Sequence, residues 1–207
     1  MTRAVKIAAD AGQVRELGIG RLIAEAFDHM DANRYLAGDD PAERLAVMSL
    51  YFGMLAEHVA SGAGQVLYIG EGSASVDATA VWFDLTVEPP PLPDYEQQLA
   101  AITGDHLPRF QALDEALNGN HPQEDKHWYL AFLAVRPGRW RQGLGSALIA
   151  HTHAELDQAG TAAYLEATDP ENARLYQDHG YDPVEPFEIK VGPVTFFPMW
   201  RTPQGAA

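Results

Sequence analysis

A segment rich in arginine and glycine, in the second half of the chain, has the residue types that bind polyanions. Residues 136–146 read RPGRWRQGLGS. They include Arg136, Arg139 and Arg141, three of only 14 basic residues in a chain of net charge −15. Gly143 and Gly145 lack a Cβ atom, so a phosphate can approach the backbone closely. The segment therefore predicts a binding site for a phosphate-bearing ligand.

The segments on either side indicate how this site is positioned. Residues 128–135 form an apolar run typical of a buried central strand, and residues 146–158 read as a helix. A strand, a glycine-rich turn and a helix in succession leave unpaired backbone N–H groups at the positive end of the helix. An anion can bind there. Ser146 is expected to donate to a phosphate or to cap the helix.

Three alternatives apply to the same turn. Gly138 and Gly143 have the spacing of a Walker loop, but Leu144 stands where its lysine is required. A dinucleotide-binding fingerprint needs a small residue where Leu148 stands, and no clear ribose-binding acid follows. An ordinary strand-to-helix turn, with glycines for tight geometry, remains open from this segment alone.

The sequence that follows resembles a known family. After a strand predicted over 163–168, a turn carries Asn172, then Tyr176 one helical turn later, then the pair Gly180-Tyr181. This pattern resembles the GCN5-related N-acetyltransferase (GNAT) family. The resemblance implies that the first turn binds the pyrophosphate of acetyl-CoA and that the preceding strand pairs with its pantetheine arm. The implied cofactor-binding residues are Leu133, Ala134, Val135, Arg139, Arg141, Gln142, Gly143, Leu144, Gly145, Ser146, Asn172 and Tyr176.

A narrower resemblance points to the puromycin N-acetyltransferase-like branch of that family. It rests on Phe27 with Arg34, and on the segments 80–82, 128–130, 143–147 and 164–166. One residue departs from the pattern. Trp140 stands where the family usually has glutamine or arginine. Because Arg139 and Arg141 flank it, we interpret the cation as displaced.

Acetyl transfer to an amine requires few protein groups. A backbone N–H near 133–135 would polarise the thioester carbonyl. Glu166 is the best candidate for the base that deprotonates the amine, and Glu188 and His127 are weaker ones. By its family position, Tyr176 would protonate the departing thiolate. Two structural alternatives stay open: Tyr176 as a buried packing residue, and Glu166 as an acidic wall that attracts a cation.

Composition argues against several other kinds of site and partner. The chain has no cysteine, so disulfides, thiolate metal sites and cysteine nucleophiles are ruled out. The eight histidines show no ligand spacing, and no metal site is predicted. The negative charge argues against nucleic acid as a partner. No apolar run reaches the length of a membrane span and no signal peptide precedes Asp10, so no membrane partner and a cytoplasmic location are expected.

The predicted fold is a single domain over residues 1–207, since this length suits one core. It is of the α/β (α+β) class: a GNAT-like mixed, largely antiparallel sheet with helices on both faces. The sequence predicts a polar connection over 28–35, helix caps at Asp10, Asp39 or Asp40, and Asp94, and a turn over 118–122. Hairpins are expected over 65–83 and 187–200.

The predicted function is an acetyl-CoA-dependent N-acetyltransferase that acts on a small-molecule amine by direct transfer in a ternary complex, as a monomer or homodimer. The alternative is a non-catalytic acyl-CoA-binding sensor or structural module on the same fold. Fold resemblance alone does not separate the two.

Overall fold

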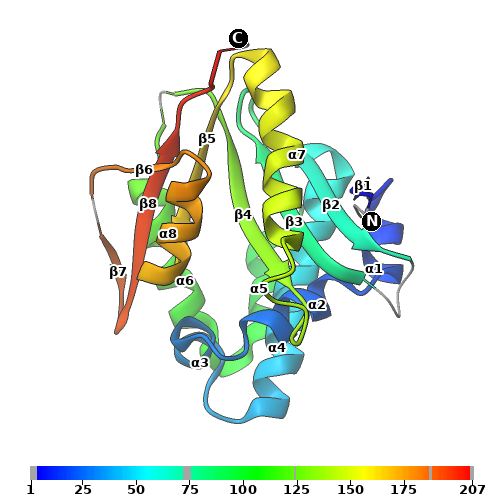
Figure 1. Cartoon of the computed structure of the whole chain (residues 1–207). Helices are drawn as coiled ribbons and strands as arrows, with labels where there is room; N and C mark the ends of the chain where they lie inside the picture. The colour runs from blue at the N-terminus through cyan, green and yellow to red at the C-terminus, as the bar shows by residue number, and fades with distance from the viewer. Residues whose placement is uncertain (1–3, 72–75, 124, 187, 206–207) are drawn as a thin grey trace.

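The computed structural model describes residues 4–71, 76–123, 125–186 and 188–205. Its strands pair in the order β1-β2-β3-β4-β5-β8-β6, with β7 also on β8 (Figure 1). Their bounds are β1 Lys6–Ile7, β2 Gly64–Gly70, β3 Val76–Asp84, β4 His127–Val135, β5 Ala162–Ala167, β6 Asp182–Pro183, β7 Ile189–Val191 and β8 Val194–Arg201. Every pairing is antiparallel except that of β4 with β5. The predicted mixed, largely antiparallel sheet is therefore confirmed.

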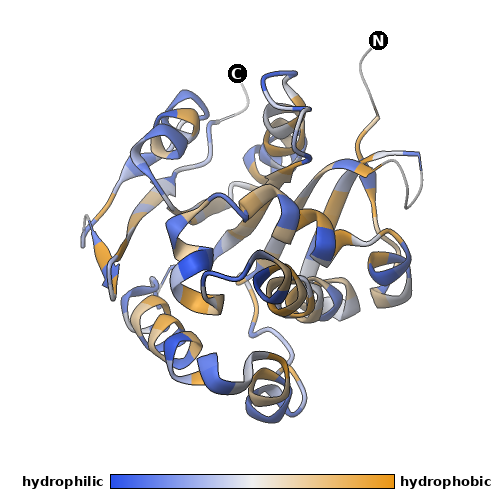
Figure 2. Ribbon diagram, turned by 90° about the horizontal axis from the view of Figure 1, so that it is seen from below, coloured by the Kyte–Doolittle hydropathy of each residue, from blue (hydrophilic) through white to orange (hydrophobic). Residues whose placement is uncertain are grey.

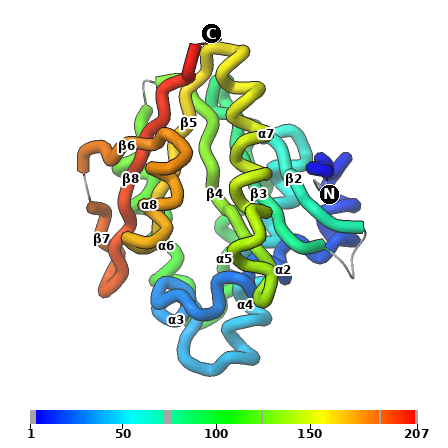
Figure 3. The backbone as a smooth tube through the Cα atoms, in the orientation of Figure 1, coloured from blue at the N-terminus to red at the C-terminus, as the bar shows by residue number. Residues whose placement is uncertain are grey.

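The sheet opens between its two central strands. β4 and β5 pair only from His127 opposite Ala162 to Tyr129 opposite Tyr164. Beyond this point the two strands diverge (Figure 3). On its other edge β4 carries a bulge at Ala131, because Val81 faces Phe132 whereas Trp82 faces Leu130. A bulge bends a strand and re-aims its side chains. Within the described residues, the edge of β4 that faces β5 is therefore unpaired over its second half.

Helices cover both faces of the sheet. On one face lie α7 and α8, which pack over the two sides of the opening (Figure 1). On the other face lie α1, α2, α4, α5 and α6, whereas α3 lies below the opening. Their bounds are α1 Ala11–Glu16, α2 Ile19–Phe27, α3 Asp31–Ala37, α4 Pro41–His58, α5 Tyr95–Thr103, α6 Leu107–Asn120, α7 Leu144–Ala159 and α8 Pro170–Asp178. Each face has its own apolar core, and apolar residues concentrate on the helix sides turned inward (Figure 2).

Helix starts follow the predicted capping chemistry in two of three places. The Asp10 side chain accepts from the N–H of Gln13, and Asp40 accepts from Ala42 and Glu43 with Pro41 next in sequence. The predicted cap at Asp94 is wrong. Asp94 has a left-handed φ of 51°, and its side chain makes no capping hydrogen bond.

The helix capped by Asp10 ends before Gly18, which has a φ of 65°. Two other predictions need correction. The connection predicted over 28–35 contains a helix, α3, that begins at Asp31. The turn predicted over 118–122 begins later, because α6 runs to Asn120. The tip of the predicted 65–83 hairpin, at 72–75, and Phe187 at the start of the second hairpin lie outside the described residues.

Candidate functional site

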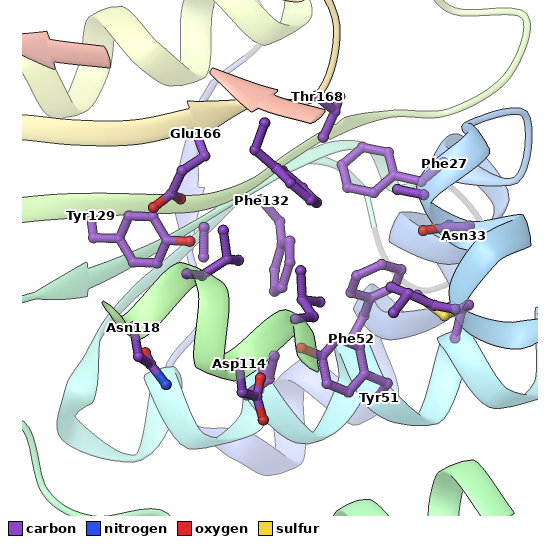
Figure 4. Close-up of a pocket in the computed structure, with 18 of the residues that line it drawn as sticks. Phe27, Asn33, Tyr51, Phe52, Asp114, Asn118, Tyr129, Phe132, Glu166 and Thr168 are labelled. Carbon is purple, nitrogen blue, oxygen red and sulfur yellow. The ribbon is translucent and has the colours of Figure 1, made fainter. Parts of the chain in front are cut away.

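Two cavities meet at the opening between β4 and β5. The first, which we call the turn cleft, has a volume of about 570 Å³ and runs from the glycine-rich turn to α8. The second, which we call the inner cavity, has a volume of about 430 Å³ and lies between the sheet, α2, α4 and α6 (Figure 4). Both are lined by Phe27, Met30, Ala131, Glu166 and Thr168. The bulge of β4 therefore lies where they join.

The glycine-rich turn has the geometry of an anion site. Gly143 occupies the N-cap position of α7 in a left-handed conformation, with a φ of 73° and no side chain to cap the helix. The N–H groups of the first helical residues, Leu144, Gly145 and Ser146, therefore have no capping acceptor. Arg141 also has a left-handed φ, 60°. Left-handed residues in a turn can point successive backbone N–H groups into one concavity. The positive end of the helix dipole adds to the attraction of that concavity for anions.

The arginines of the turn differ in how far they are neutralised. The Arg136 side chain donates to the Val76 carbonyl at 2.8 Å and lies 3.7 Å from Glu25. The Arg139 guanidinium donates to Asp77 at 3.1 Å. Arg141 is exposed and lines the turn cleft, and within the described chain it has no acidic partner. Arg141 is thus the arginine most available to a phosphate.

Trp140 closes the turn against the strand. Its indole N–H donates to the Val135 carbonyl at 3.0 Å, and its ring lies 5.9 Å from that of His29. The side chain remains 53% exposed and forms part of the cleft wall. The departure at this position therefore replaces a family polar group by an aromatic clamp, with Arg139 and Arg141 on either side.

The structure brings most, not all, of the predicted cofactor residues to the turn cleft. Leu133, Val135, Arg139, Arg141, Gly143, Leu144, Gly145, Ser146, Asn172 and Tyr176 line it. Ala134 does not, because its side chain is buried in the core on the opposite face of β4. Gln142 is exposed outside the lining. Ser146 does not cap α7, since its hydroxyl shares a 3.0 Å hydrogen bond with Nε2 of His179.

On the other side of the cleft, α8 presents Asn172 and Tyr176. The Asn172 amide donates to Asp169 at 2.7 Å and to Thr168 at 3.2 Å, so it fixes the turn that precedes the helix. Tyr176 lies in the second turn of α8. Burial, together with the charge of Asp169, raises the pKa of Tyr176 above its ordinary value. The phenol therefore stays protonated at neutral pH.

Glu166, on β5, lies at the junction of the two cavities. Its side chain is only 3% exposed, and its Oε1 atom has no hydrogen-bond partner within the described chain. Burial first, then the charge of Glu166, raises the pKa of Tyr129 and Tyr164 beside it. Figure 4 shows the Glu166 and Tyr129 side chains directed toward one another. A buried carboxylate with an open oxygen is suited to accept a proton or to bind a cation.

The inner cavity combines aromatic walls with acidic groups. Its rings belong to Phe27, Tyr51, Phe52, Phe83, Tyr95, Tyr129, Phe132 and Phe196. Asp114, on α6, is its second carboxylate and accepts a 2.7 Å hydrogen bond from the Tyr95 hydroxyl. No lysine or arginine is among the described residues that line this cavity. The inner cavity therefore favours a ligand that is both apolar and cationic.

Sequence reasoning missed Asp114 and His121. Asp114 lies on an amphipathic helix, where an acidic residue is usually solvated, and nothing in the sequence marks it. His121 lies in the predicted turn after that helix, yet its Nδ1 atom is 3.7 Å from Oε1 of Glu166. The contact depends on the return of the chain into β4, a long-range pairing that local patterns do not reveal.

The described residues also bear on metal sites and membrane spans. No group of three or more His, Cys, Asp or Glu side chains is arranged to hold a metal ion. No helix in the described part is both long and apolar enough to cross a bilayer.

Comparison with known proteins agrees with this geometry. The model of the Acetyltransferase (GNAT) family matches residues 93–181, which include the glycine-rich turn, Glu166, Asn172 and Tyr176. A protein from Corynebacterium glutamicum, described as histone acetyltransferase HPA2 and related acetyltransferase, is similar in structure. It has 24% identity and a TM-score of 0.70, over 100% of this chain and 99% of that one.

Two insect enzymes share the fold at lower identity. Arylalkylamine N-acetyltransferase 2 from Aedes aegypti has 14% identity and a TM-score of 0.58, over 97% of this chain and 99% of its own. A Drosophila melanogaster polyamine N-acetyltransferase, which forms N-acetylagmatine, has 15% identity and a TM-score of 0.56, over 96% and 100%.

The family model matches residues 93–181, and the chain shares its fold with solved acetyltransferases. Together they support an N-acetyltransferase. The narrower resemblance to the puromycin N-acetyltransferase-like branch stays a prediction.

Proposed function

We propose that the protein transfers an acetyl group from acetyl-CoA to the amine of a small molecule, by direct transfer in a ternary complex. The observation that carries this proposal is the junction of the two cavities at Ala131, Glu166 and Thr168. One cavity has an anion-binding turn and the other has acidic and aromatic walls. Two ligands bound in this way would meet beside a carboxylate.

The residues of the turn cleft fit coenzyme A. The uncapped N-terminus of α7 and the side chain of Arg141 would hold its phosphates. The unpaired edge of β4 between Leu130 and Val135 offers backbone groups for an extended amide-bearing arm. When bound, acetyl-CoA supplies the acetyl group as a thioester.

The groups at the junction support direct transfer. The amine arrives as an ammonium ion, and Glu166 would take one of its protons. A backbone N–H of the opened β4 would stabilise the oxygen of the acetyl group as the C–N bond forms. When the C–S bond breaks, Tyr176 would donate a proton to the sulfur, and the second proton lost by the nitrogen would restore Tyr176. The products are an amide, a thiol and one proton, so the reaction balances without a further reactant.

A small-amine acceptor is also consistent with the proteins that share the fold, since two of them are named for arylalkylamines and for a polyamine. Glu166 and Tyr176 favour turnover over acyl-CoA sensing, because a sensor needs neither a buried open carboxylate nor an unpartnered phenol.

A screen with acetyl-CoA and a panel of amines tests the proposal. Thiol release and the mass of the acetylated product are measured together, with Glu166→Gln as the impaired variant and Glu115→Gln, an exposed residue of α6, as its control. We expect product from at least one amine class and a large loss only in Glu166→Gln. Tight acetyl-CoA binding with no product from any amine would instead identify a sensor.

A further inference from the structure

The inner cavity has two carboxylates on different walls. Glu166 comes from β5, beside the turn cleft, and Asp114 comes from α6 (Figure 4). Aromatic rings also line the cavity, including Phe52 and Phe132, whose centroids are 4.9 Å apart. Each carboxylate is therefore placed to meet a different part of one ligand.

Asp114 has a hydrogen-bonding capacity that the protein does not use up. Its Oδ2 atom accepts from the Tyr95 hydroxyl, and within the described chain its Oδ1 atom has no donor. Burial raises the pKa of Asp114, since the charged form is poorly solvated there. His58, the nearby basic lining residue, has its pKa lowered by burial and so does not supply a cation. A donor brought by the ligand would satisfy Asp114.

We propose that the acceptor carries two donor groups: the amine to be acetylated beside Glu166, and a second cationic group at Asp114, joined by an aromatic or apolar body. This inference rests on the proposed function and names its substrate class. The aromatic walls recognise the body through burial and through the attraction of rings for cations.

Two isosteric pairs of amines test it. Each pair compares a diamine with a monoamine in which a methyl group replaces the second ammonium: 1,4-bis(aminomethyl)benzene with 4-ethylbenzylamine, and 1,6-diaminohexane with heptylamine. After correction for its two equivalent amines, we expect the better diamine to have a kcat/KM roughly tenfold above its partner, the scale of one charge-assisted contact. Asp114→Asn should bring that ratio near one, whereas Glu115→Gln should leave it unchanged.

The outcomes separate the two proposals. If no amine is acetylated, the proposed function fails. If amines are acetylated without preference for either diamine, or if Asp114→Asn keeps the preference, the substrate class is wrong. The wild-type preference needs no variant, so it remains decisive even if Asp114→Asn does not fold.

A second inference rests on the two histidines beside Glu166. The Nδ1 atom of His127 lies 2.6 Å from the Asp125 carbonyl, which can only accept, so His127 carries its hydrogen on Nδ1. Burial lowers the pKa of His127 and keeps it neutral. Its Nε2 atom must then accept from Nε2 of His121, 3.0 Å away. In the neutral form of His121, Nδ1 then carries no hydrogen, and it faces Oε1 of Glu166.

In that form Nδ1 of His121 and Oε1 of Glu166 are two acceptors 3.7 Å apart, so the pair has room for one proton between them. From the sheet, Tyr129 and Tyr164 also pack on the His121 ring, with centroids 4.9 and 4.8 Å away. Asp125 and Lys126 line a third cavity, of about 880 Å³, that His121 and His127 share. His121 thus separates the inner cavity from a second route to the surface.

We infer that His121 and Glu166 act as one base, in which the proton taken from the amine comes to lie between Nδ1 of His121 and Oε1 of Glu166. His127 is the positioning residue that fixes the tautomer. The proton then leaves on the side of the third cavity, and the pair returns to its starting state.

Imidazole ¹⁵N NMR of the free protein tests the tautomers without any turnover. We expect hydrogen on Nε2 of neutral His121 and on Nδ1 of His127; hydrogen on Nδ1 of neutral His121 would overturn the inference. In the kinetic test, His121→Gln should move the acidic limb of the kcat/KM profile, whereas His151→Gln, on the surface of α7, should not. An unchanged limb in His121→Gln would assign the base to Glu166 alone.

Discussion

The ring of Tyr176 packs edge-on against the ring of Tyr181, with centroids 5.9 Å apart and planes at 71°. This contact helps to hold the ring of Tyr176 in place. Its hydroxyl has no hydrogen-bond partner within the described chain, and the residue is half-buried and lines the turn cleft. A substitution at Tyr176 can therefore remove the hydroxyl and leave the packing of the ring unchanged.

Tyr176→Phe should lower turnover about 100-fold, as expected for the loss of a general acid. The ring keeps its contact with Tyr181, so acetyl-CoA affinity and the melting temperature should change little. Stopped assays of thiol release, with calorimetric titration and thermal unfolding on the same preparation, check this. Wild-type turnover across the pH range would make Tyr176 a packing residue only.

Arg141→Ala should raise the Kd of acetyl-CoA about tenfold, because one charge-assisted contact to phosphate is lost. Arg139→Ala should have a smaller effect, since Asp77 already neutralises its guanidinium at 3.1 Å. Calorimetric titration measures both. Arg15→Ala, an exposed arginine of α1 paired with Glu57, is the matched control for loss of charge. Unchanged affinity in both turn variants and their double mutant would remove coenzyme A from this turn.

Much of the fold could be predicted because its signals are local. Capping aspartates, an apolar central strand and a glycine-rich turn each depend on a few neighbouring residues, as at Asp10 and Asp40. Much of the turn cleft could also be predicted, because many of its lining residues lie in one segment of the chain, 130–146. Asp94 shows the limit of this approach: the residue type suits a cap, but its left-handed backbone turns the side chain away.

The inner cavity could not be predicted, because tertiary packing alone assembles it. Asp114, on α6, and His121, just after it, line the same cavity as Glu166 of β5, and no spacing in the sequence encodes that arrangement. Ser146 shows the same effect. Its position predicts a helix cap, whereas α8 brings His179 within 3.0 Å of its hydroxyl. Gly20 is a further example: glycine is a poor helix former, yet Gly20 lies inside α2, where α4 crosses closely.

Gly20→Ala should destabilise the protein by about 3 kcal/mol through overpacking. An added Cβ would lie 2.6 Å from Cα of Gly53 and would also collide with the Ser49 carbonyl, both parts of the α4 backbone that cannot move aside easily. Urea denaturation measures the change. Gly119→Ala is the control, since an added Cβ there meets nothing within 4 Å. Equal stability of Gly20→Ala and wild type would contradict the close crossing of α2 and α4.

His153 predicts how folding stability depends on pH. Its side chain is buried and shares a 3.1 Å hydrogen bond with the Tyr181 hydroxyl. Burial first, then the positive charges of Arg201 and His179, lowers the pKa of His153 from 6.5 to about 3. Between these values the unfolded chain binds a proton that the folded protein excludes. The contribution of His153 is therefore complete above the unfolded pKa and is lost as the pH falls below it.

His153→Gln should flatten the dependence of unfolding free energy on pH between about 4 and 6.5, by up to ~1.4 kcal/mol per pH unit. Glutamine keeps a group that can bond the Tyr181 hydroxyl but does not titrate. Urea denaturation at several pH values within this window measures the slope. His151→Gln, on the exposed side of the same helix, should retain the wild-type slope. Parallel stability curves for His153→Gln and wild type would show that His153 is protonated in the folded protein as readily as in the unfolded chain.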